Sequence, residues 1–175
     1  MIWYTALVTA VAAERLAEVA VALRNTRWSL ARGGTEAGQG HYPVMVALHT
    51  ALLAACLAEP WLAARPFLPW LGWTMAAVVV AAQALRWWCV RTLGRRWNTR
   101  VIVVPGLPLV TGGPYRWLRH PNYVAVVAEG AALPLVHGAW VTAVAFTLAN
   151  AALLAVRVRC EDGALARLAP ADVRT

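Results

Sequence analysis

Lysine is absent from this 175-residue chain, and charged residues make up only 14% of it. A soluble domain has about 25% charged residues. A chain with 61% apolar residues and a mean hydropathy of +0.56 could not hide so much apolar surface from water. The three cysteines, Cys56, Cys89 and Cys160, form neither a CxxC motif nor a Cys/His cluster. We therefore expect a helical integral membrane protein with no disulfide framework and no metal site.

All 16 positively charged residues are arginines, and the formal net charge is +8. Such a basic chain could bind nucleic acid, but the arginines lie between apolar stretches and form no separate basic domain. Anionic lipid headgroups are the simpler partner. We expect contacts with membrane lipids and none with nucleic acid, and the oligomeric state stays open.

Five apolar segments are long enough, or nearly so, to cross a bilayer core, which requires roughly 20 helical residues. They are residues 2–23, 43–57, 69–88, 123–136 and 139–156. The last two are joined by a short turn, which predicts a helical hairpin with its tip near residues 134–138. No basic region or small-residue cleavage site marks the first segment as a signal peptide. The pattern predicts an all-α membrane protein with about five transmembrane helices.

The arginines predict an orientation, because positive residues stay on the cytoplasmic side. Only Arg65 lies between the second and third segments. The other connections hold many more: Arg24, Arg27 and Arg32 follow the first segment, Arg91, Arg95, Arg96, Arg100, Arg116 and Arg119 the third, and Arg157, Arg159, Arg167 and Arg174 the fifth. We therefore expect the N-terminus outside, the C-terminus inside, and any soluble chemistry on the cytoplasmic face.

The connection over residues 94–121 is too polar to span a membrane. Val101 to Val104 form a short β-branched run, and several glycines and prolines after it force turns. Pro121 is well placed as the first residue of a helix. Arg119 and His120 then precede a helix N-terminus, whose free N–H groups favour an anion such as a carboxylate or phosphate.

The stretch GGPYRWLRHPNY at residues 112–123, followed after the hairpin by RVRCED at residues 157–162, resembles the isoprenylcysteine carboxyl methyltransferase family. The pattern of that family is G-x-Y-x-x-x-R-H-P-x-Y and later R-x-x-x-E-E. The resemblance covers about residues 85–165 and implies a membrane-embedded enzyme that uses S-adenosyl-L-methionine. It divides a single domain, residues 1–175, into an acceptor side, residues 1–84, and a cofactor-binding core, residues 85–175.

The resemblance also implies roles for individual residues. His120, Tyr123 and Glu161 would hold the cofactor, with the backbone from Gly113 to Tyr115 closing over it. Asp162 would be the second acid of the pair, although it is shorter than the family's glutamate. Arg119 and one of Arg157 or Arg159 would lie beside the acceptor oxygen and the cofactor. These would be the catalytic arginines, although headgroup anchoring is an alternative role for all three.

These residue types suit the chemistry. The cofactor carries a carboxylate, an ammonium and a ribose, so arginine and histidine can bind its anionic group while glutamate binds the ammonium or the hydroxyls. Methyl transfer is an in-line displacement that needs alignment and the exclusion of water. No metal is required.

The N-terminal half more loosely resembles bacterial O-methyltransferases that act on alkylresorcinols and alkylpyrones. On that basis we interpret Glu36, His41 and His49 as a lid or as acceptor-binding residues, the alternative being plain loop and capping roles. Trp117, which lies inside the first motif, is a further candidate for binding the acceptor, although the tryptophans near predicted span ends are typical of an aromatic belt.

Ionisable residues within a span usually face a partner. Glu14 and Glu18 are one helical turn apart, and we expect them to pair with arginines of neighbouring helices, while Arg15 does not share their face. Gln83, Arg86 and Arg91 either line the pocket or pair with Glu129.

The function predicted from the sequence is methylation of a carboxylate, phenol or enol oxygen on a lipophilic acceptor dissolved in the bilayer. An isoprenylcysteine-like acid and a polyketide-derived phenolic lipid or alkylpyrone both fit. The setting would be a bacterial cell membrane, with the active site facing the cytoplasm. A sterol-type reductase with a nicotinamide cofactor is an alternative, but the chain is short and offers no additional basic pocket. A non-catalytic scaffold or small transporter is another, and inverted repeats that would favour transport are not evident.

Overall fold

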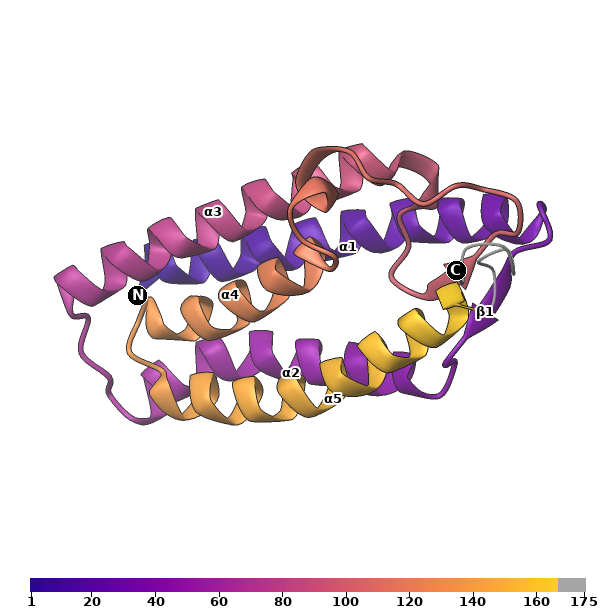
Figure 1. The fold of residues 1–175 in the computed structure, drawn as a ribbon. Helices are drawn as coiled ribbons and strands as arrows, with labels where there is room; N and C mark the ends of the chain where they lie inside the picture. The colour runs from indigo at the N-terminus through magenta and orange to yellow at the C-terminus, as the bar shows by residue number, and fades with distance from the viewer. Residues whose placement is uncertain (167–175) are drawn as a thin grey trace.

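The computed structural model describes residues 1–166 of the chain, which form an elongated bundle of five α-helices with a two-stranded sheet at one end (Figure 1). The helices are α1 (Ile2–Leu30), α2 (His41–Leu62), α3 (Pro69–Leu93), α4 (Pro121–Leu135) and α5 (Trp140–Ala166); the strands are β1 (Thr35–Ala37) and β2 (Val101–Val103), and two 3₁₀ turns are η1 (Gly94–Arg96) and η2 (Gly113–Arg116). Arg167 and Arg174, used above to predict orientation, lie outside the described residues.

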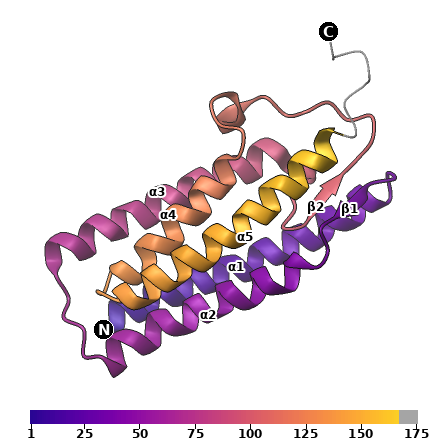
Figure 2. The same ribbon diagram turned by 60° about the horizontal axis from the view of Figure 1, so that its bottom comes forward.

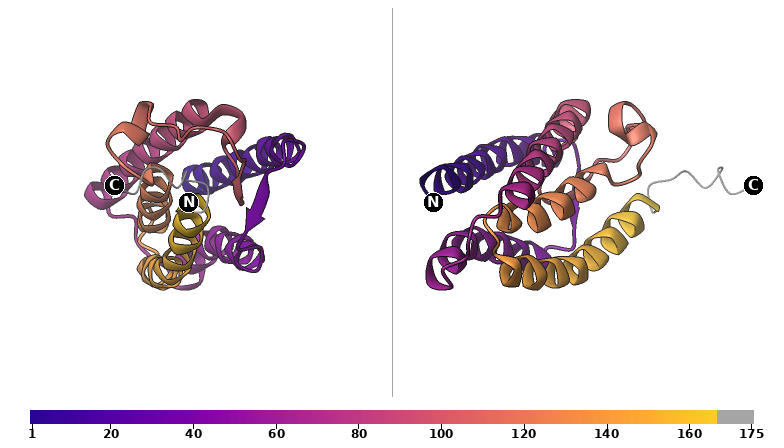
Figure 3. Two further views of the ribbon diagram at one scale, coloured as in Figure 1. Left: turned by 45° about the vertical axis from the view of Figure 1, so that its right-hand side comes forward. Right: turned by 90° about the vertical axis from the view of Figure 1, so that its left-hand side faces the viewer.

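Helix α4 is the central element of the bundle. It packs against α3 on one side and α5 on the other, and α5 also packs along α2. Figure 3 shows α4 between the pair α1 and α3 and the pair α2 and α5. Its N-terminal end, at Pro121, therefore faces the end of the bundle that carries the sheet.

Within the described residues, three helical segments are long and apolar enough to cross a membrane: His41–Leu62, Pro69–Arg96 and Trp140–Ala166. Helix α1 is interrupted by charged residues, and α4 has only 15 residues. The five predicted segments all became helices. The structure supports three of them as spans by length and hydropathy.

The chain is not wholly α-helical, which corrects one detail of the predicted fold class. Strand β1 pairs antiparallel with β2, with Glu36 opposite Ile102. The valine run predicted β2, whereas in the sequence Thr-Glu-Ala of β1 only the threonine favours a strand. Nη1 of Arg100 lies 3.2 Å from both carboxylate oxygens of Glu36 and holds the two segments together. The sheet ties the α1–α2 loop to the connection that leads into α4.

A buried group of charged side chains joins α1, α3 and α4 halfway along the bundle. We call it the central ionic cluster: Glu14, Arg15, Glu18, Arg86 and Glu129. Arg15 contacts Oε2 of Glu18 at 2.6 Å and Oε2 of Glu129 at 3.2 Å. Arg86 contacts the same Glu129 oxygen at 2.9 Å, which confirms the predicted pairing.

Arg15 also joins the cluster, although it does not share the helix face of Glu14 and Glu18. Its long flexible stem carries the guanidinium well away from the direction of the Cα–Cβ bond. Nη2 of Arg15 reaches Glu14 at 3.0 Å, and Gln83 of α3 also bonds Glu14. Arg91 is exposed and takes no part.

Candidate functional site

The end of α5 meets the start of α4, and this brings the two sequence motifs together. We call the group Arg119, His120, Tyr123, Glu161 and Asp162 the α4–α5 cluster. The hydroxyl of Tyr123 donates a 2.6 Å hydrogen bond to Oε2 of Glu161, and Nδ1 of His120 lies 3.8 Å from the same oxygen. Oδ1 of Asp162 lies 3.1 Å from Nη2 of Arg119 and 3.3 Å from Nε2 of His120.

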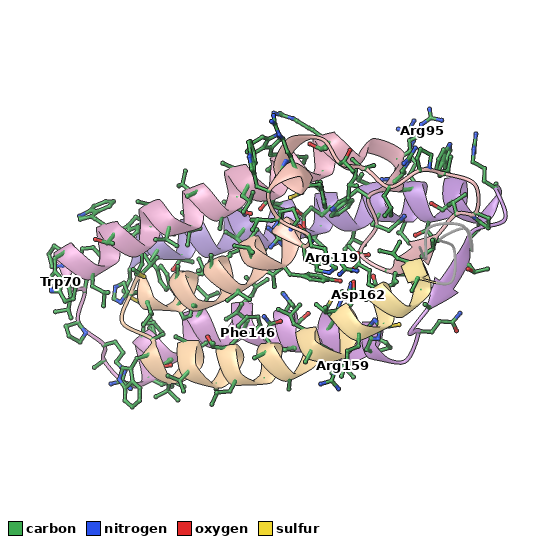
Figure 4. All side chains as sticks on the ribbon, in the orientation of Figure 1. Trp70, Arg95, Arg119, Phe146, Arg159 and Asp162 are labelled. Atoms are coloured by element: carbon green, nitrogen blue, oxygen red, sulfur yellow. The ribbon has the colours of Figure 1, made fainter. Side chains whose placement is uncertain are left out.

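Local sequence explains why these side chains converge. Proline at the first position of α4 fixes the helix start, and His120 stands just before it as the N-cap residue. The His120 ring stacks on that of Tyr123, one turn further on, at a centroid distance of 5.4 Å. Helix α5 continues past its apolar part as far as Ala166, so its last turns carry Glu161 and Asp162 to the same place. Figure 4 shows Arg119 and Asp162 close together there.

Arg157 is buried beside the cluster, with only 5% of its surface exposed. Its Nη2 donates to the carbonyl oxygen of Thr99 at 2.8 Å, and its Nη1 donates to Sδ of Met45 at 2.9 Å. The guanidinium carbon stands 5.9 Å from the centroid of the Tyr123 ring. Among the described residues, no carboxylate lies within 4 Å of Arg157. A buried cation with only a neutral carbonyl and a thioether as acceptors is unusual, because desolvating a charge is costly unless an anion compensates it.

Arg159 points the other way. Residues two apart on a helix project from opposite sides, since each step turns the helix by about 100°. Arg159 is exposed, and Figure 4 shows it on the side of α5 away from Asp162. From the sequence, either Arg157 or Arg159 could face the site. In the structure Arg157 is buried beside it and Arg159 is exposed.

The 3₁₀ turn η2 packs against α3 and precedes the cluster residues Arg119 and His120 in the chain. Gly113 has a φ of +55°, and a Cβ there would collide with Oγ1 of Thr92 on α3, so only glycine fits. Tyr115 follows, with its hydroxyl beside the Cys89 thiol. Burial, and then the neighbouring Cys89 thiol and Glu161 carboxylate, raise the pKa of Tyr115 well above its ordinary value of 10. Tyr115 is therefore within electrostatic reach of Glu161.

The four residues predicted for the acceptor are dispersed. Glu36 is engaged in its pair with Arg100. Trp117 is 67% exposed and packs edge-on against Trp88, outside the bundle. His49 lies deeper in the bundle, where its Nδ1 is 2.9 Å from its own helix carbonyl at Met45.

Of these four, His41 lies next to the second motif. A Cβ placed on Gly38 would collide with the His41 ring and would lie 2.6 Å from Sγ of Cys160. The histidine at the start of α2 and the residue just before Glu161 therefore share one small space. His49, by contrast, packs edge-on against Phe146, at a ring distance of 5.3 Å.

Several buried polar atoms around the cluster have no hydrogen-bond partner. They include Nε2 of His120, Oδ1 of Asn122, Oδ1 of Asp162 and Nε of Arg157. His120 and Asp162 are close enough for charge attraction but are not aligned for a hydrogen bond. Buried polar groups are nearly always paired in proteins, so these atoms are available to bind a polar ligand.

Sequence reasoning missed Asn122, Met45 and Thr99. Asn122 occupies the unspecified position of the first motif, between Pro121 and Tyr123, and could have been suspected from its place. Thr99 contributes a backbone carbonyl and Met45 a thioether from another helix, and neither leaves a sequence signal. In the part of the chain that the structure describes, no three His, Cys, Asp or Glu side chains gather as metal ligands would.

An apolar helical bundle with three helices long enough to cross a membrane indicates a class, the integral membrane proteins. Comparison with known proteins narrows the class: residues 75–167 match the model of the isoprenylcysteine carboxyl methyltransferase family, and the chain belongs to this family. Family membership and the three apolar helices together indicate an integral membrane methyltransferase.

Two relatives resemble nearly the whole chain. The uncharacterized protein YpbQ of Bacillus subtilis (strain 168) is 41% identical over 166 residues, which are 94% of this chain and 96% of that protein. An uncharacterized protein of Haemophilus influenzae is 23% identical over 159 residues, 89% of this chain and 91% of its own length. The similarity to both therefore extends through the N-terminal helices, beyond the region matched by the family model.

Proposed function

We propose that this protein transfers a methyl group from S-adenosyl-L-methionine to an oxygen of a lipophilic, membrane-dissolved acceptor. The observation that carries the proposal is the direct bond between the two family motifs, from the Tyr123 hydroxyl to the Glu161 carboxylate. It assembles one site from segments 38 residues apart.

The residues of the α4–α5 cluster fit this cofactor. Its amino-acid end carries one cation and one anion, and the cluster offers the carboxylates of Glu161 and Asp162 beside Arg119 and His120. The unpartnered polar atoms include both a ring nitrogen, on His120, and an amide oxygen, on Asn122, as a ligand with donors and acceptors requires. When bound, S-adenosyl-L-methionine supplies a methyl group on a sulfonium, activated for displacement.

Each residue of the cluster then has a task. Glu161, held by Tyr123, would bind the ammonium or the ribose, and His120 with Arg119 would bind the carboxylate. The backbone of Gly113 and Tyr115 would exclude water from the α3 side. Asp162 would keep the charges of Arg119 and His120 in place.

Arg157 is the best candidate for the residue that binds the acceptor. Its buried, unpaired charge favours an anionic oxygen, and a guanidinium beside that oxygen would orient it and keep it ionised. Thr99 and Met45 fix the guanidinium in place before any acceptor arrives. Because Met45 belongs to α2, the N-terminal half would help to form the acceptor site.

The proposed contact between Arg157 and the acceptor oxygen favours an acidic acceptor. A carboxylate, or a phenol or enol acidic enough to ionise, suits Arg157 better than a neutral amine does. Isoprenylcysteine-like acids and polyketide-derived phenolic lipids or alkylpyrones meet this condition, and the bilayer would deliver them. The arginine-rich connections support an orientation with the N-terminus outside a bacterial membrane and the site on its cytoplasmic face. Helices α1 and α4 would then complete five crossings.

The test is to label the acceptor. Bacterial membranes containing the protein would be incubated with S-adenosyl-L-methionine labelled in its methyl group, and lipids and proteins would be separated and counted. We expect label in the lipid fraction with the wild type and with Arg159→Gln, and its loss with Arg157→Gln. Equal labelling in membranes lacking the protein would overturn the proposal. A thermal shift with a reduced nicotinamide cofactor instead would favour the reductase.

A further inference from the structure

The connection between β2 and α4 exposes apolar side chains next to arginines. Leu109 and Trp117 are 69% and 67% exposed, and Leu107 and Leu118 are exposed as well. We call these four residues the η2 face, because they flank η2. Removing these exposed apolar side chains from water would be favourable.

The depth of the η2 face follows from its packing on α3. Gly113 lies against Thr92 and Trp88, and the ring of Trp117 lies 5.7 Å from that of Trp88. Those α3 residues occupy the last turns of the candidate span Pro69–Arg96. Figure 2 shows η2 beside the end of α3 and outside the bundle. If α3 crosses the membrane, the η2 face lies at the depth of the headgroups.

The charges that this part of the chain itself carries are all of one sign. From Trp88 through Arg119 the sequence holds six arginines and no acidic residue. Glu36 compensates Arg100, and Asp162 compensates Arg119. In the described residues the other four have no carboxylate within 4 Å: Arg91, Arg95, Arg96 and Arg116. Arg96 also donates a 2.5 Å hydrogen bond to the carbonyl of Pro108, which fastens the connection to the end of α3.

We propose that the η2 face is embedded in the headgroup layer of the membrane and binds anionic phospholipids. Leu109 and Trp117 enter the boundary between headgroups and acyl chains, and the four uncompensated arginines contact lipid phosphates. Basic side chains are attracted to an anionic membrane surface. A lipid surface offers both acyl chains for the exposed apolar side chains and phosphates for the arginines, so it fits the two features together. This inference is independent of methyl transfer.

Spin labels measure the depth directly. In a Cys160→Ser background, Leu109→Cys and Trp117→Cys would each carry a nitroxide in vesicles of phosphatidylcholine, with or without phosphatidylglycerol. Gln39→Cys, in the exposed loop before α2, is the matched water-facing control. We expect the labels at 109 and 117 to be accessible to oxygen and shielded from a water-soluble nickel chelate, more strongly in the anionic vesicles. Nickel accessibility equal to that at residue 39 in both vesicle types would overturn the proposal. Because Leu109 is not packed, its result stands even if the Trp117 variant folds poorly.

A second comparison tests the lipid charge. Replacing Arg95, Arg96 and Arg116 together by glutamine should abolish the difference between neutral and anionic vesicles. The same change at Arg24, Arg27 and Arg32, near the end of α1, should preserve it. If both triple variants behave alike, or if phosphatidylglycerol has no effect on the wild type, the anionic-lipid site is wrong.

Discussion

The hydroxyl of Tyr123 and the carboxylate of Glu161 are joined by a 2.6 Å hydrogen bond between the first turn of α4 and the last turns of α5. Helices α4 and α5 form a hairpin, and the turn that joins them lies at the opposite end of the bundle. The bond therefore closes the open end of that hairpin and fixes the distance between the two motifs on which the proposed cofactor site depends.

Replacing Tyr123 by phenylalanine should weaken the site without unfolding it. A hydrogen bond to a charged group contributes about 1.5–3 kcal/mol, so the affinity for S-adenosyl-L-methionine should fall by about tenfold or more. Calorimetric titration of the purified protein measures this. Tyr42→Phe is the control, because the Tyr42 ring lies under Arg100 and its hydroxyl makes no hydrogen bond to Glu161. An unchanged affinity in Tyr123→Phe would show that the bond does not organise the site.

The two arginines of α5 should differ sharply in their effect on catalysis. Removing an electrostatic contact to a reacting oxygen typically lowers kcat by about 10²–10³-fold, and this is expected for Arg157→Gln. Arg159→Gln should retain most of the activity, because Arg159 faces outward. Initial rates of methyl transfer to the acceptor identified by labelling measure both. Equal losses in the two variants would contradict the proposed division of roles.

Two neighbouring glycines provide a test of η2. Gly113→Ala places a side chain at a left-handed φ, which costs about 1–2 kcal/mol, and also pushes it against Thr92. Gly112→Ala has a φ of −87° and open space around its Cβ. We expect a lower thermal midpoint and weaker cofactor binding only for Gly113→Ala, measured by circular dichroism and calorimetry. If Gly112→Ala is equally harmful, the closure of η2 on α3 is not the cause.

Much of the fold could be predicted because the helix starts carry local signals. Pro69 and Pro121 mark two of them, and both lie where the sequence placed them. Helices α1, α2 and α5 end well beyond their apolar runs, because a helix continues into the polar layer where hydropathy no longer reports it. Strand β1 could not be predicted, since its pairing with β2 is a tertiary contact and only one of its three residues, Thr35, favours a strand.

The sequence predicted most residues of the candidate site, but it did not predict which of the further candidates point into the site. The motifs point to His120, Tyr123, Glu161 and Asp162, which do converge. Whether Arg157 or Arg159 faces inward depends on where α5 contacts its neighbours, and the motif does not contain that information. Trp117 belongs to the motif by sequence position, but the η2 turn directs it outward onto Trp88.

The central ionic cluster should dominate stability. Removing one partner of a buried ion pair costs about 3–5 kcal/mol, because the other charge is left without compensation. Arg86→Met should therefore lower the thermal midpoint strongly in detergent. Arg91→Met, on the exposed side of the same helix, should have little effect. Adding Glu129→Gln to Arg86→Met should recover part of the loss, and a further large decrease would show that Glu129 has another role.

Direct binding of the cofactor tests the central claim. Purified protein in lipid nanodiscs would be titrated with S-adenosyl-L-methionine by calorimetry, in the wild type, Glu161→Ala and Arg159→Gln. The account predicts saturable binding near one molecule per chain in the wild type and in Arg159→Gln, with loss of binding in Glu161→Ala. No binding to the wild type, or equal binding by all three proteins, would contradict a cofactor site between the start of α4 and the end of α5.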